Sequence, residues 1–429
     1  MGWQDYLDTN KDRFEQELLD FVRIPSVSAR PEHMPDVERA ADWVAERLRA
    51  AGIENVEILP TTGHPAVYGD WLHAGSDKPT VLVYGHFDVQ PAEPLDLWTS
   101  PPFAPEIRDC RVWGRGASDD KGGMLIPILS AEALLKETGR LPVNVKFIFE
   151  GQEEIGSPDM PPFIAAERDR LACDMIFSAD GLQWSGDEAQ IVMGLKGLVG
   201  VEVTVDGPAT DQHSGLHGGG INNPLMALSQ ILASMKDAQT GRITIDGFYD
   251  DVLDLTDEDR AEIARVPFDE ADYLAETGAP APFGEEGYSV RERLWARPTL
   301  EVNGLTGGYQ GAGSKTVLPA RASAKITCRL VGDQDPDALR RAIRAHVEAR
   351  LSPDAGVRWD NDLEGSRASV MNIERPEFEA ARGALSDEWN REAVFTGMGG
   401  SIPVVGYFRS VLGLDSMLVG FANEDDAIH

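Results

Sequence analysis

The stretch that decides the fold class is residues 80–88, which read TVLVYGHFD. A short apolar run that stops abruptly at polar residues predicts a buried β-strand. Three similar runs recur along the chain, with helical or loop sequence between them: Val143–Phe149, Met175–Phe177 and Met417–Val419. This alternation predicts an α/β domain whose sheet is largely parallel.

Residues that can bind a metal follow each of these predicted strands, and one more lies in residues 114–123, GRGASDDKGG, just before an apolar helix. Ligands of open α/β sheets bind at the carboxyl ends of the strands, so we expect these side chains to gather there. Mixed histidine and carboxylate ligands suit zinc, manganese or cobalt. The candidates are His86, Asp119, Glu153, Glu154, Asp180 and His429.

Each of these patterns also has an ordinary structural explanation. A Glu153-Glu154 pair is most often a solvated helix end, and a strand-terminal Asp180 often caps the next helix. The repetition of potential ligands at four strand ends favours a site over these explanations. Asp88, two residues after His86, has the spacing to hold the His86 ring in one tautomer. His213, within DQHSGLHGGG (211–220), is by itself typical of a turn histidine.

The chain has the length of about two domains, and its texture changes after residue 196. Predicted strands and helices there indicate a small α+β domain inserted into the first one. We therefore predict domain segments 1–196, 197–368 and 369–429. The predicted elements of the insertion are strands Leu198–Val205 and Ala322–Val331 and helices Pro224–Met235 and Pro336–Arg350, and two further helices are predicted over 3–22 and 36–51.

The charge balance excludes two classes of partner. Lys and Arg total 39, Asp and Glu total 72, and the formal net charge is −33. Such a surface repels phosphate backbones and anionic lipids, so neither nucleic acid nor a membrane is an expected partner. No signal peptide or membrane-length apolar window is visible, which predicts a cytoplasmic protein. The three cysteines form no CxxC pair, which predicts buried free thiols.

Other motifs that indicate catalysis or nucleotide binding are absent from the sequence or incomplete in it. The chain contains no HExxH zinc helix, and no GxGxxG follows a predicted strand. Residues 399–403, GGSIP, lack the final glycine of a nucleophile elbow. Residues 308–316 have one residue too many before Lys315 to form a phosphate-binding loop.

Three motifs carry a family resemblance. GHFDVQP (85–91), GRGASDDKG (114–122) and EGQEEIGS (150–157) resemble the signatures of the M20 metallopeptidases, and the chain is most similar to their carnosinase and cytosolic nonspecific dipeptidase branch. The resemblance implies a zinc-peptidase-like catalytic domain with an inserted ferredoxin-like lid that mediates homodimerisation. It also implies two divalent metal ions per subunit. Zinc is the expected metal, and manganese and cobalt are the alternatives.

The resemblance implies a role for each candidate. Asp119 bridges the two metals, His86 and Asp180 hold one metal, and Glu154 and His429 hold the other. Glu153 is the general base for a metal-bridging water. With Asp88, which the spacing already places beside His86, and His213, it makes up the expected catalytic residues. His213 reaches the site of the partner subunit and stabilises the oxyanion. The substrate-binding positions are Arg329, Thr316 and Ser401.

Two departures from the family pattern leave alternatives open. Gly397-Met398 stands where the dipeptidase branch often has a charged Arg-Glu pair. The sequence ends at His429, where relatives continue with a loop and a helix, so we expect a closing segment to be lacking. The leading hypothesis is hydrolysis of dipeptides or short peptides. The alternatives are an N-acyl amino acid deacylase or desuccinylase on the same scaffold, and a non-catalytic binding relative.

Overall fold

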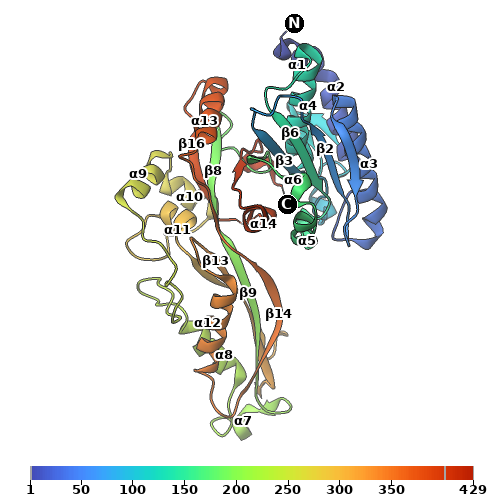
Figure 1. The fold of residues 1–429 in the computed structure, drawn as a ribbon. Coiled ribbons are helices and arrows are strands. Elements are labelled where there is room, and N and C mark those ends of the chain that lie inside the picture. Colours follow the sequence, from blue (N-terminus) through green and yellow to red (C-terminus); the bar gives the residue numbers. More distant parts are fainter. Residues whose placement is uncertain (1, 401, 429) are drawn as a thin grey trace. The chain divides into compact units, whose positions relative to one another are not determined.

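The computed structural model describes residues 2–400 and 402–428, without the side chains of residues 361–364 and 424. The chain forms two compact units (Figure 1). The first contains residues 1–193, 371–395 and 402–429, and the second contains residues 194–370 and 396–401. The first unit is therefore built from segments that are far apart in the sequence.

The first unit is organised around a mixed sheet with a parallel centre. Within this unit the strands lie in the order β1-β2-β6-β3-β7-β17-β8. β3 is parallel to β6 and β7, and β17 is parallel to β7, whereas β1, β2 and β8 pair antiparallel with their neighbours. The predicted parallel core is confirmed. The strands are β1 (Glu54–Leu59), β2 (Ala66–Trp71), β3 (Thr80–His86), β6 (Asn144–Glu150), β7 (Met175–Ser178), β8 (Gln190–Leu195) and β17 (Ser416–Leu418), whereas β15 (Ser369–Val370) and most of β16 (Val394–Met398) belong to the second unit.

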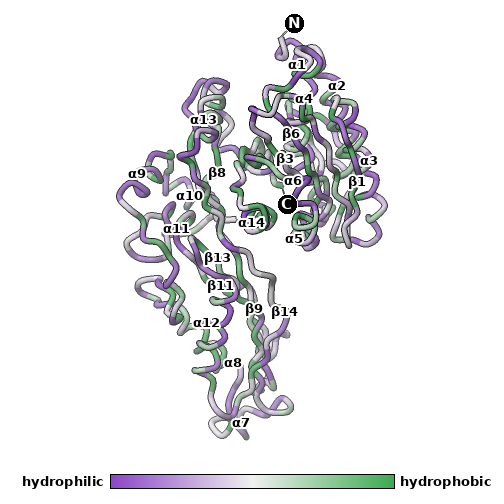
Figure 2. Tube along the Cα trace, in the orientation of Figure 1, coloured by the Kyte–Doolittle hydropathy of each residue, from purple (hydrophilic) through white to green (hydrophobic). Residues whose placement is uncertain are grey.

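Helices cover both faces of this sheet. α3 (Met34–Ala51) and α4 (Lys121–Thr138) pack with Val83 and Phe147 in one apolar core. Successive strand residues point to opposite faces, so Tyr84 meets the other layer, where its ring packs edge-on against Phe408 of α14 (Pro403–Leu412) at 5.6 Å. Figure 2 shows hydrophobic and hydrophilic segments alternating along α3, as expected for a helix with one buried side.

The N-terminal helical pattern is interrupted. The sequence predicts one helix over residues 3–22, but the structure forms α1 (Trp3–Thr9) and α2 (Lys11–Val22), with Asn10 between them. The Asn10 side-chain amide donates to the Tyr6 carbonyl at 2.8 Å, and asparagine side chains compete with the helical backbone in this way. The remaining elements of this unit are β4 (Glu106–Arg108), β5 (Arg111–Trp113), α5 (Met160–Ala166), α6 (Arg168–Leu171), α13 (Pro376–Trp389) and the 3-10 turns η1 (Pro31–His33), η2 (Leu95–Leu97), η3 (Glu153–Ile155) and η4 (Glu424–Asp426).

The second unit has a ferredoxin-like topology. Its four-stranded antiparallel sheet has the order β11-β13-β9-β14, and α8 and α12 pack on it to give the chain order β9-α8-β11-β13-α12-β14. The predicted fold class is confirmed in both units. The elements are β9 (Gly197–Asp206), α8 (Pro224–Ala233), β11 (Thr299–Gly307), β13 (Arg321–Leu330), α12 (Pro336–Glu348) and β14 (Gly356–Ser366), with β10 (Gln212–His213), α7 (Ser214–His217), α9 (Asp257–Arg265), α10 (Glu270–Thr277), α11 (Val290–Ala296) and β12 (Val317–Leu318) beside them.

The predictions about the cysteines and about membrane spans can be compared with the structure. All three cysteines are free, but only Cys328 is fully buried, and Cys110 is exposed, so the prediction of buried thiols is wrong for Cys110. Cys110 lies in the tight turn between β4 and β5, which leaves its side chain outside any core. Among the described residues, no helix is both long and apolar enough to cross a membrane.

Candidate metal centre

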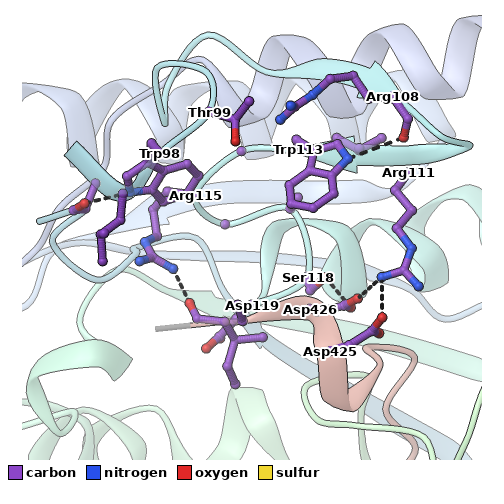
Figure 3. A pocket seen from close by; sticks show the side chains of 18 of the residues that line it. Trp98, Thr99, Arg108, Arg111, Trp113, Arg115, Ser118, Asp119, Asp425 and Asp426 are labelled. Atoms are coloured by element: carbon purple, nitrogen blue, oxygen red, sulfur yellow. Dashed lines mark hydrogen bonds and ion pairs between the residues drawn. The ribbon is translucent and has the colours of Figure 1, made fainter. Parts of the chain in front are cut away.

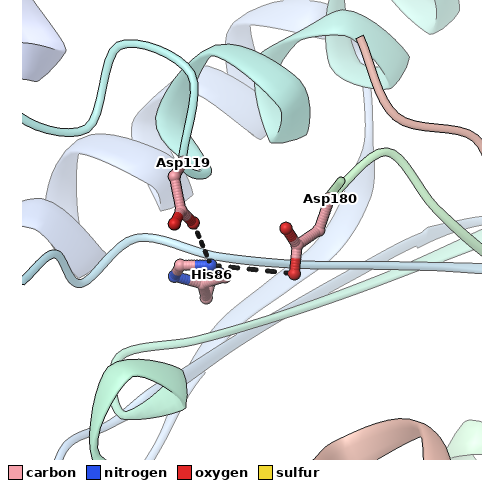
Figure 4. Close-up of side chains that lie close together, drawn as sticks. All are labelled: His86, Asp119 and Asp180. Carbon is pink, nitrogen blue, oxygen red and sulfur yellow. Dashed lines mark ion pairs between the residues drawn. The ribbon is translucent and has the colours of Figure 1, made fainter. Parts of the chain in front are cut away.

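Three of the candidate ligands form a tight cluster in the first unit. One donor atom from each of His86, Asp119 and Asp180 lies within 4.8 Å of the others (Figure 4). The Nε2 atom of His86 is 3.1 Å from Oδ1 of Asp119 and 3.9 Å from Oδ2 of Asp180. The two carboxylates therefore converge on one nitrogen of the imidazole.

The parallel strands explain why these residues meet. His86 is the last residue of β3, and Asp180 comes two residues after the end of β7. Tyr84 is in register with Ser178 across the two strands, so both chains leave the sheet at the same edge. Asp119 lies just before α4, which packs on β3. The carboxyl edge of the sheet thus collects all three side chains.

Asp120 is part of the same arrangement, and the sequence reasoning assigned it no role. It is fully buried, and its Oδ2 atom accepts a hydrogen bond from the His86 backbone N–H at 3.1 Å. A Cβ atom on Gly85 would lie 2.7 Å from that carboxylate, and a Cβ on Gly123 would lie 2.2 Å from it. Glycine at both positions lets Asp120 reach β3. These two glycines are the feature of the sequence that could have indicated the close approach of Asp120.

Asp88 connects His86 to the two glutamates. Its Oδ1 and Oδ2 atoms accept the backbone N–H groups of Glu153 and Glu154, each at 3.1 Å. The Nδ1 atom of His86 is 3.2 Å from the Asp88 carbonyl oxygen and 3.4 Å from its Oδ1 atom. A proton on Nδ1 therefore has an acceptor in Asp88, and Nε2 remains the nitrogen that can bind a metal.

Glu154 is held by a residue that the sequence reasoning passed over. The Gln90 backbone N–H donates to Oε1 of Glu154 at 3.1 Å, and the Gln90 side-chain amide donates to Oε2 at 2.8 Å. Burial, opposed in part by attraction to His86, raises the pKa of Glu154 to about 7. Gln90 therefore orients both carboxylate oxygens of Glu154, although Glu154 is not part of the cluster of His86, Asp119 and Asp180.

The site concentrates negative charge in a buried place. Burial raises the pKa of Glu153 and of Asp120 well above the usual range, and burial together with the charge of Asp88 raises the pKa of Glu150 to about 8. Burial disfavours the charged form of His86, but the Asp119 and Asp88 carboxylates outweigh it and raise its pKa well above the usual value. Clustered buried carboxylates are costly unless a cation compensates them.

A divalent cation fits these residues. Among the residues that the structure describes, none forms a hydrogen bond with the buried Nε2 atom of His86, although two carboxylates face it. A metal ion would satisfy this nitrogen and offset the repulsion between Asp119 and Asp180. Nitrogen and oxygen donors in one group match zinc, manganese and cobalt.

A cavity of about 480 Å³ adjoins Asp119 within the first unit (Figure 3). Trp98 and Trp113 form part of its lining, together with three arginines from or near the β4–β5 hairpin, Arg108, Arg111 and Arg115. Its opposite wall is the segment 423–428, where Arg111 lies 2.8 Å from the Asp425 carboxylate. The sequence reasoning did not foresee this cavity, because its wall is assembled from segments about 300 residues apart.

Three of the remaining candidates belong to the second unit. His213 and Thr316 are exposed in the second unit, where β10 pairs with β12 and the Ser214 N–H donates to the Thr316 carbonyl at 3.0 Å. Arg329 is half-buried on β13 of that unit, and burial lowers its pKa. Ser401 and His429 lie outside the described residues.

Known proteins resemble this chain over nearly its whole length. The model of peptidase family M20/M25/M40 matches residues 82–429. The Cys-Gly metallodipeptidase DUG1 of Candida albicans is 30% identical over 99% of this chain and 91% of its own length. The Beta-Ala-His dipeptidase of Rattus norvegicus is 29% identical over 99% of this chain and 89% of its own length.

A solved structure has the same fold. The structure of the dipeptidase Dug1p from Saccharomyces cerevisiae superposes with a TM-score of 0.81 at 29% identity, over 99% of this chain and 91% of that chain. The resemblance that the three sequence motifs indicate is confirmed, and the family binds divalent metal. On the extent of the family match and on these relatives, the chain belongs to peptidase family M20/M25/M40.

Proposed function

We propose that this protein is a metal-dependent dipeptidase that hydrolyses the peptide bond of dipeptides or short peptides. The observation that carries the proposal is the His86–Asp119–Asp180 cluster. Burial raises the pKa of the nearby Glu153 carboxyl, as expected for a general base. The names of the similar proteins, Cys-Gly and Beta-Ala-His dipeptidases, support dipeptides as the substrate class.

Two divalent ions, with zinc the first choice, are part of the proposal. His86 and Asp180 would hold one ion, Glu154 and His429 the other, and Asp119 both. When bound, such ions polarise a carbonyl group and make a water molecule easier to deprotonate. Support comes from the Nε2 atom of His86, which faces the carboxylates of Asp119 and Asp180, and from the fixed orientation of Glu154 by Gln90.

Glu153 is the proposed general base. Its backbone is fixed by the hydrogen bond to Asp88, and η3 (Glu153–Ile155) places its carboxyl in the acid-rich group. A base works best when its pKa lies near the working pH, and burial moves the Glu153 pKa in that direction. The carboxylate takes a proton from the attacking water and delivers it to the leaving amine.

The second unit supplies the proposed substrate contacts. The guanidinium of Arg329 matches the geometry of a substrate carboxylate, and His213 donates a hydrogen bond to the developing oxyanion. Thr316, whose carbonyl accepts the N–H of the residue after His213, and Ser401 complete the substrate-binding positions. Their roles rest on the family resemblance of the sequence around them.

We also propose a cytoplasmic homodimer that forms through the second unit, with the inserted domain as the lid. Exposed apolar side chains near α7 and α8 support this interface: Leu216, Ile221 and Met226 are 77%, 38% and 56% exposed. Contiguous exposed apolar surface is a common feature of association sites. Light scattering on the wild-type protein and a Leu216→Asp variant tests it, and a wild-type monomer would contradict it.

The function is tested with chelated protein that is reconstituted with zinc, manganese or cobalt. A panel of dipeptides and N-acyl amino acids is then offered. We expect metal-dependent cleavage of dipeptides. Cleavage of acyl substrates alone would identify a deacylase, and the absence of activity with every metal would leave a binding protein.

A Glu153→Gln variant tests the mechanism in the same assay. General base catalysis contributes about 100- to 10,000-fold to rate, so kcat should fall by that order while the metal content is unchanged. Glu388→Gln, at an exposed position on α13, is the matched control and should behave as wild type. Normal turnover by Glu153→Gln would remove Glu153 from the role of base.

A further inference from the structure

Residues 21–26, which we call the brace segment, contact two loops that carry proposed metal ligands. The segment consists of the last two residues of α2 and the loop that follows this helix. The Ser26 hydroxyl donates to the Phe87 carbonyl at 2.5 Å, and the Val89 N–H donates to the Ser26 carbonyl at 3.0 Å. Phe87 and Val89 lie one and three residues after His86, so Ser26 holds the backbone that follows this proposed ligand.

The second contact of the brace segment is made by Lys121, which comes two residues after Asp119. Its side chain is fully buried at the start of α4, and its ammonium donates to the Ile24 carbonyl at 2.6 Å and to the Phe21 carbonyl at 3.1 Å. The ammonium also lies 5.0 Å from the centre of the Phe21 ring. Burying an ammonium is costly unless it is hydrogen-bonded, so these contacts hold Lys121 and the loop before it in place.

Asp120 closes the arrangement, because its Oδ2 atom accepts the His86 N–H at 3.1 Å. The three segments 21–26, 86–89 and 119–121 are thus joined pairwise by hydrogen bonds. All three side chains that form these bonds are fully buried. A shift of one segment would leave buried polar groups unsatisfied, which is costly. The closed ring of contacts therefore opposes any change in the separation of the two ligand-bearing loops.

The separation of these loops matters for the metal, because they carry His86 and Asp119. The Nε2 atom of His86 is 3.1 Å from Oδ1 of Asp119. Ligands of a tetrahedral zinc ion lie about 2.0–2.2 Å from the metal, and hence roughly 3.3 Å from one another. The two donor atoms are therefore held close to the spacing that one ion requires, and metal affinity depends on how firmly this spacing is kept.

We propose that Lys121 and Ser26 are positioning residues for the metal ion at the His86–Asp119 pair, and that they act by fastening both ligand-bearing loops to the brace segment. Both side chains bond to backbone carbonyls, so they act through the backbone beside a ligand and not on the ion itself. The inference rests on the proposed function only in taking a divalent ion as the occupant of the cluster.

The test is a cobalt titration of the chelated protein, followed by visible absorption, since the spectrum of bound cobalt reports the geometry of its ligands. Lys121→Met removes the ammonium and nearly keeps the volume of the side chain. Lys146→Met is the matched control, because the buried ammonium of Lys146 also donates to two backbone carbonyls, those of Arg170 at 2.6 Å and Ala172 at 2.7 Å. Lys146 lies in the first half of β6, away from the carboxyl edge of the sheet that carries the ligands.

Lys121→Met should weaken cobalt binding by about 10- to 100-fold, the usual effect of removing a group that orients a ligand, and should change the cobalt spectrum. Lys146→Met should lower the temperature of thermal unfolding but bind cobalt as wild type does. Both variants lose a buried lysine with two hydrogen bonds, so the comparison separates positioning from general destabilisation. Equal cobalt affinity in the two variants would overturn the positioning role of Lys121.

Ser26→Ala provides the test if Lys121→Met does not fold. It removes only the hydroxyl bond to the Phe87 carbonyl and should weaken cobalt binding by about 10-fold. Ser130→Ala, which removes an exposed hydroxyl bonded to the Ile126 carbonyl within α4, should have no effect. Wild-type affinity and spectrum in Ser26→Ala would refute the role of the brace segment. Wild-type protein that binds cobalt but cleaves no dipeptide would refute the proposed function and leave the positioning result intact.

Discussion

The Oδ1 atom of Asp88 accepts a hydrogen bond from the backbone N–H of Glu153 at 3.1 Å, across 65 residues of sequence. Its other oxygen accepts the N–H of Glu154, so one fully buried carboxylate fixes both glutamates. The same residue faces the Nδ1 atom of His86. Asp88 therefore couples the orientation of the imidazole to that of the proposed base.

Asp88→Asn should lower kcat/KM for dipeptides by about 10- to 100-fold, with weaker metal binding. The asparagine side chain has only one oxygen, and its NH₂ group would face a backbone N–H that is also a donor. One of the two hydrogen bonds to Glu153 and Glu154 is therefore lost. Steady-state kinetics and metal titration measure both effects. Asp70→Asn, at a buried aspartate on β2 that accepts from Tyr68, is the control. Wild-type kinetics in Asp88→Asn would show that the double hydrogen bond is dispensable.

The metal-free protein should lose stability as the pH rises from about 4.3 toward 8. In the folded state the pKa of Glu150 is raised to about 8 by burial, whereas in the unfolded chain it is about 4.3. Between these values the folded state holds a proton that the unfolded chain has released. Stability therefore falls with pH in this window, by up to about 1.4 kcal/mol per pH unit for this group.

Glu150→Gln isolates this effect, because the amide does not titrate. Urea unfolding of the metal-free protein at pH 5, 6, 7 and 8 should give a shallower fall for the variant than for wild type. Glu388→Gln should follow the wild-type curve. Parallel curves for Glu150→Gln and wild type would mean that Glu150 is ionised in the folded protein at neutral pH.

Arg329→Lys should reduce kcat/KM for dipeptides by roughly 10- to 100-fold, mainly through KM. A charge-assisted hydrogen bond contributes about 1.5–3 kcal/mol, and lysine cannot reproduce the bidentate contact. Dipeptide amides, which lack the carboxylate, should be cleaved equally by both proteins. Arg321→Lys, exposed on the same strand β13, serves as control. An equal loss on acids and amides would argue against carboxylate recognition.

His213→Ala should lower kcat by roughly 100- to 1,000-fold, the usual effect of removing an oxyanion donor, without changing the oligomeric state. The residue is exposed, and its Nδ1 atom accepts the Gly215 N–H at 3.0 Å, which leaves Nε2 as the donor. His217→Ala, four residues further in an exposed position, is the control. Unchanged kcat in His213→Ala would exclude the oxyanion role.

The sequence by itself determined the parallel central strands, the fold class and the types of side chain at the strand ends. The predicted run Thr80–Tyr84 lies within β3, and the predicted run Met175–Phe177 lies within β7. Apolar periodicity is a local property, so it survives without knowledge of the fold. The family resemblance could be recognised for the same reason, because each of the three motifs is a short unbroken stretch of sequence.

Only the tertiary structure decided which atoms meet. It distinguished Asp119, which faces the Nε2 atom of His86, from Asp120, which accepts the His86 N–H, although the two are adjacent in sequence. It also revealed the contact of Arg115 with Ile428, 313 residues away. Such contacts depend on how the chain returns to the sheet edge and on small residues such as Gly85 that permit close approach. Local pattern does not specify these partners, because they are set by close packing between segments that are distant in the sequence.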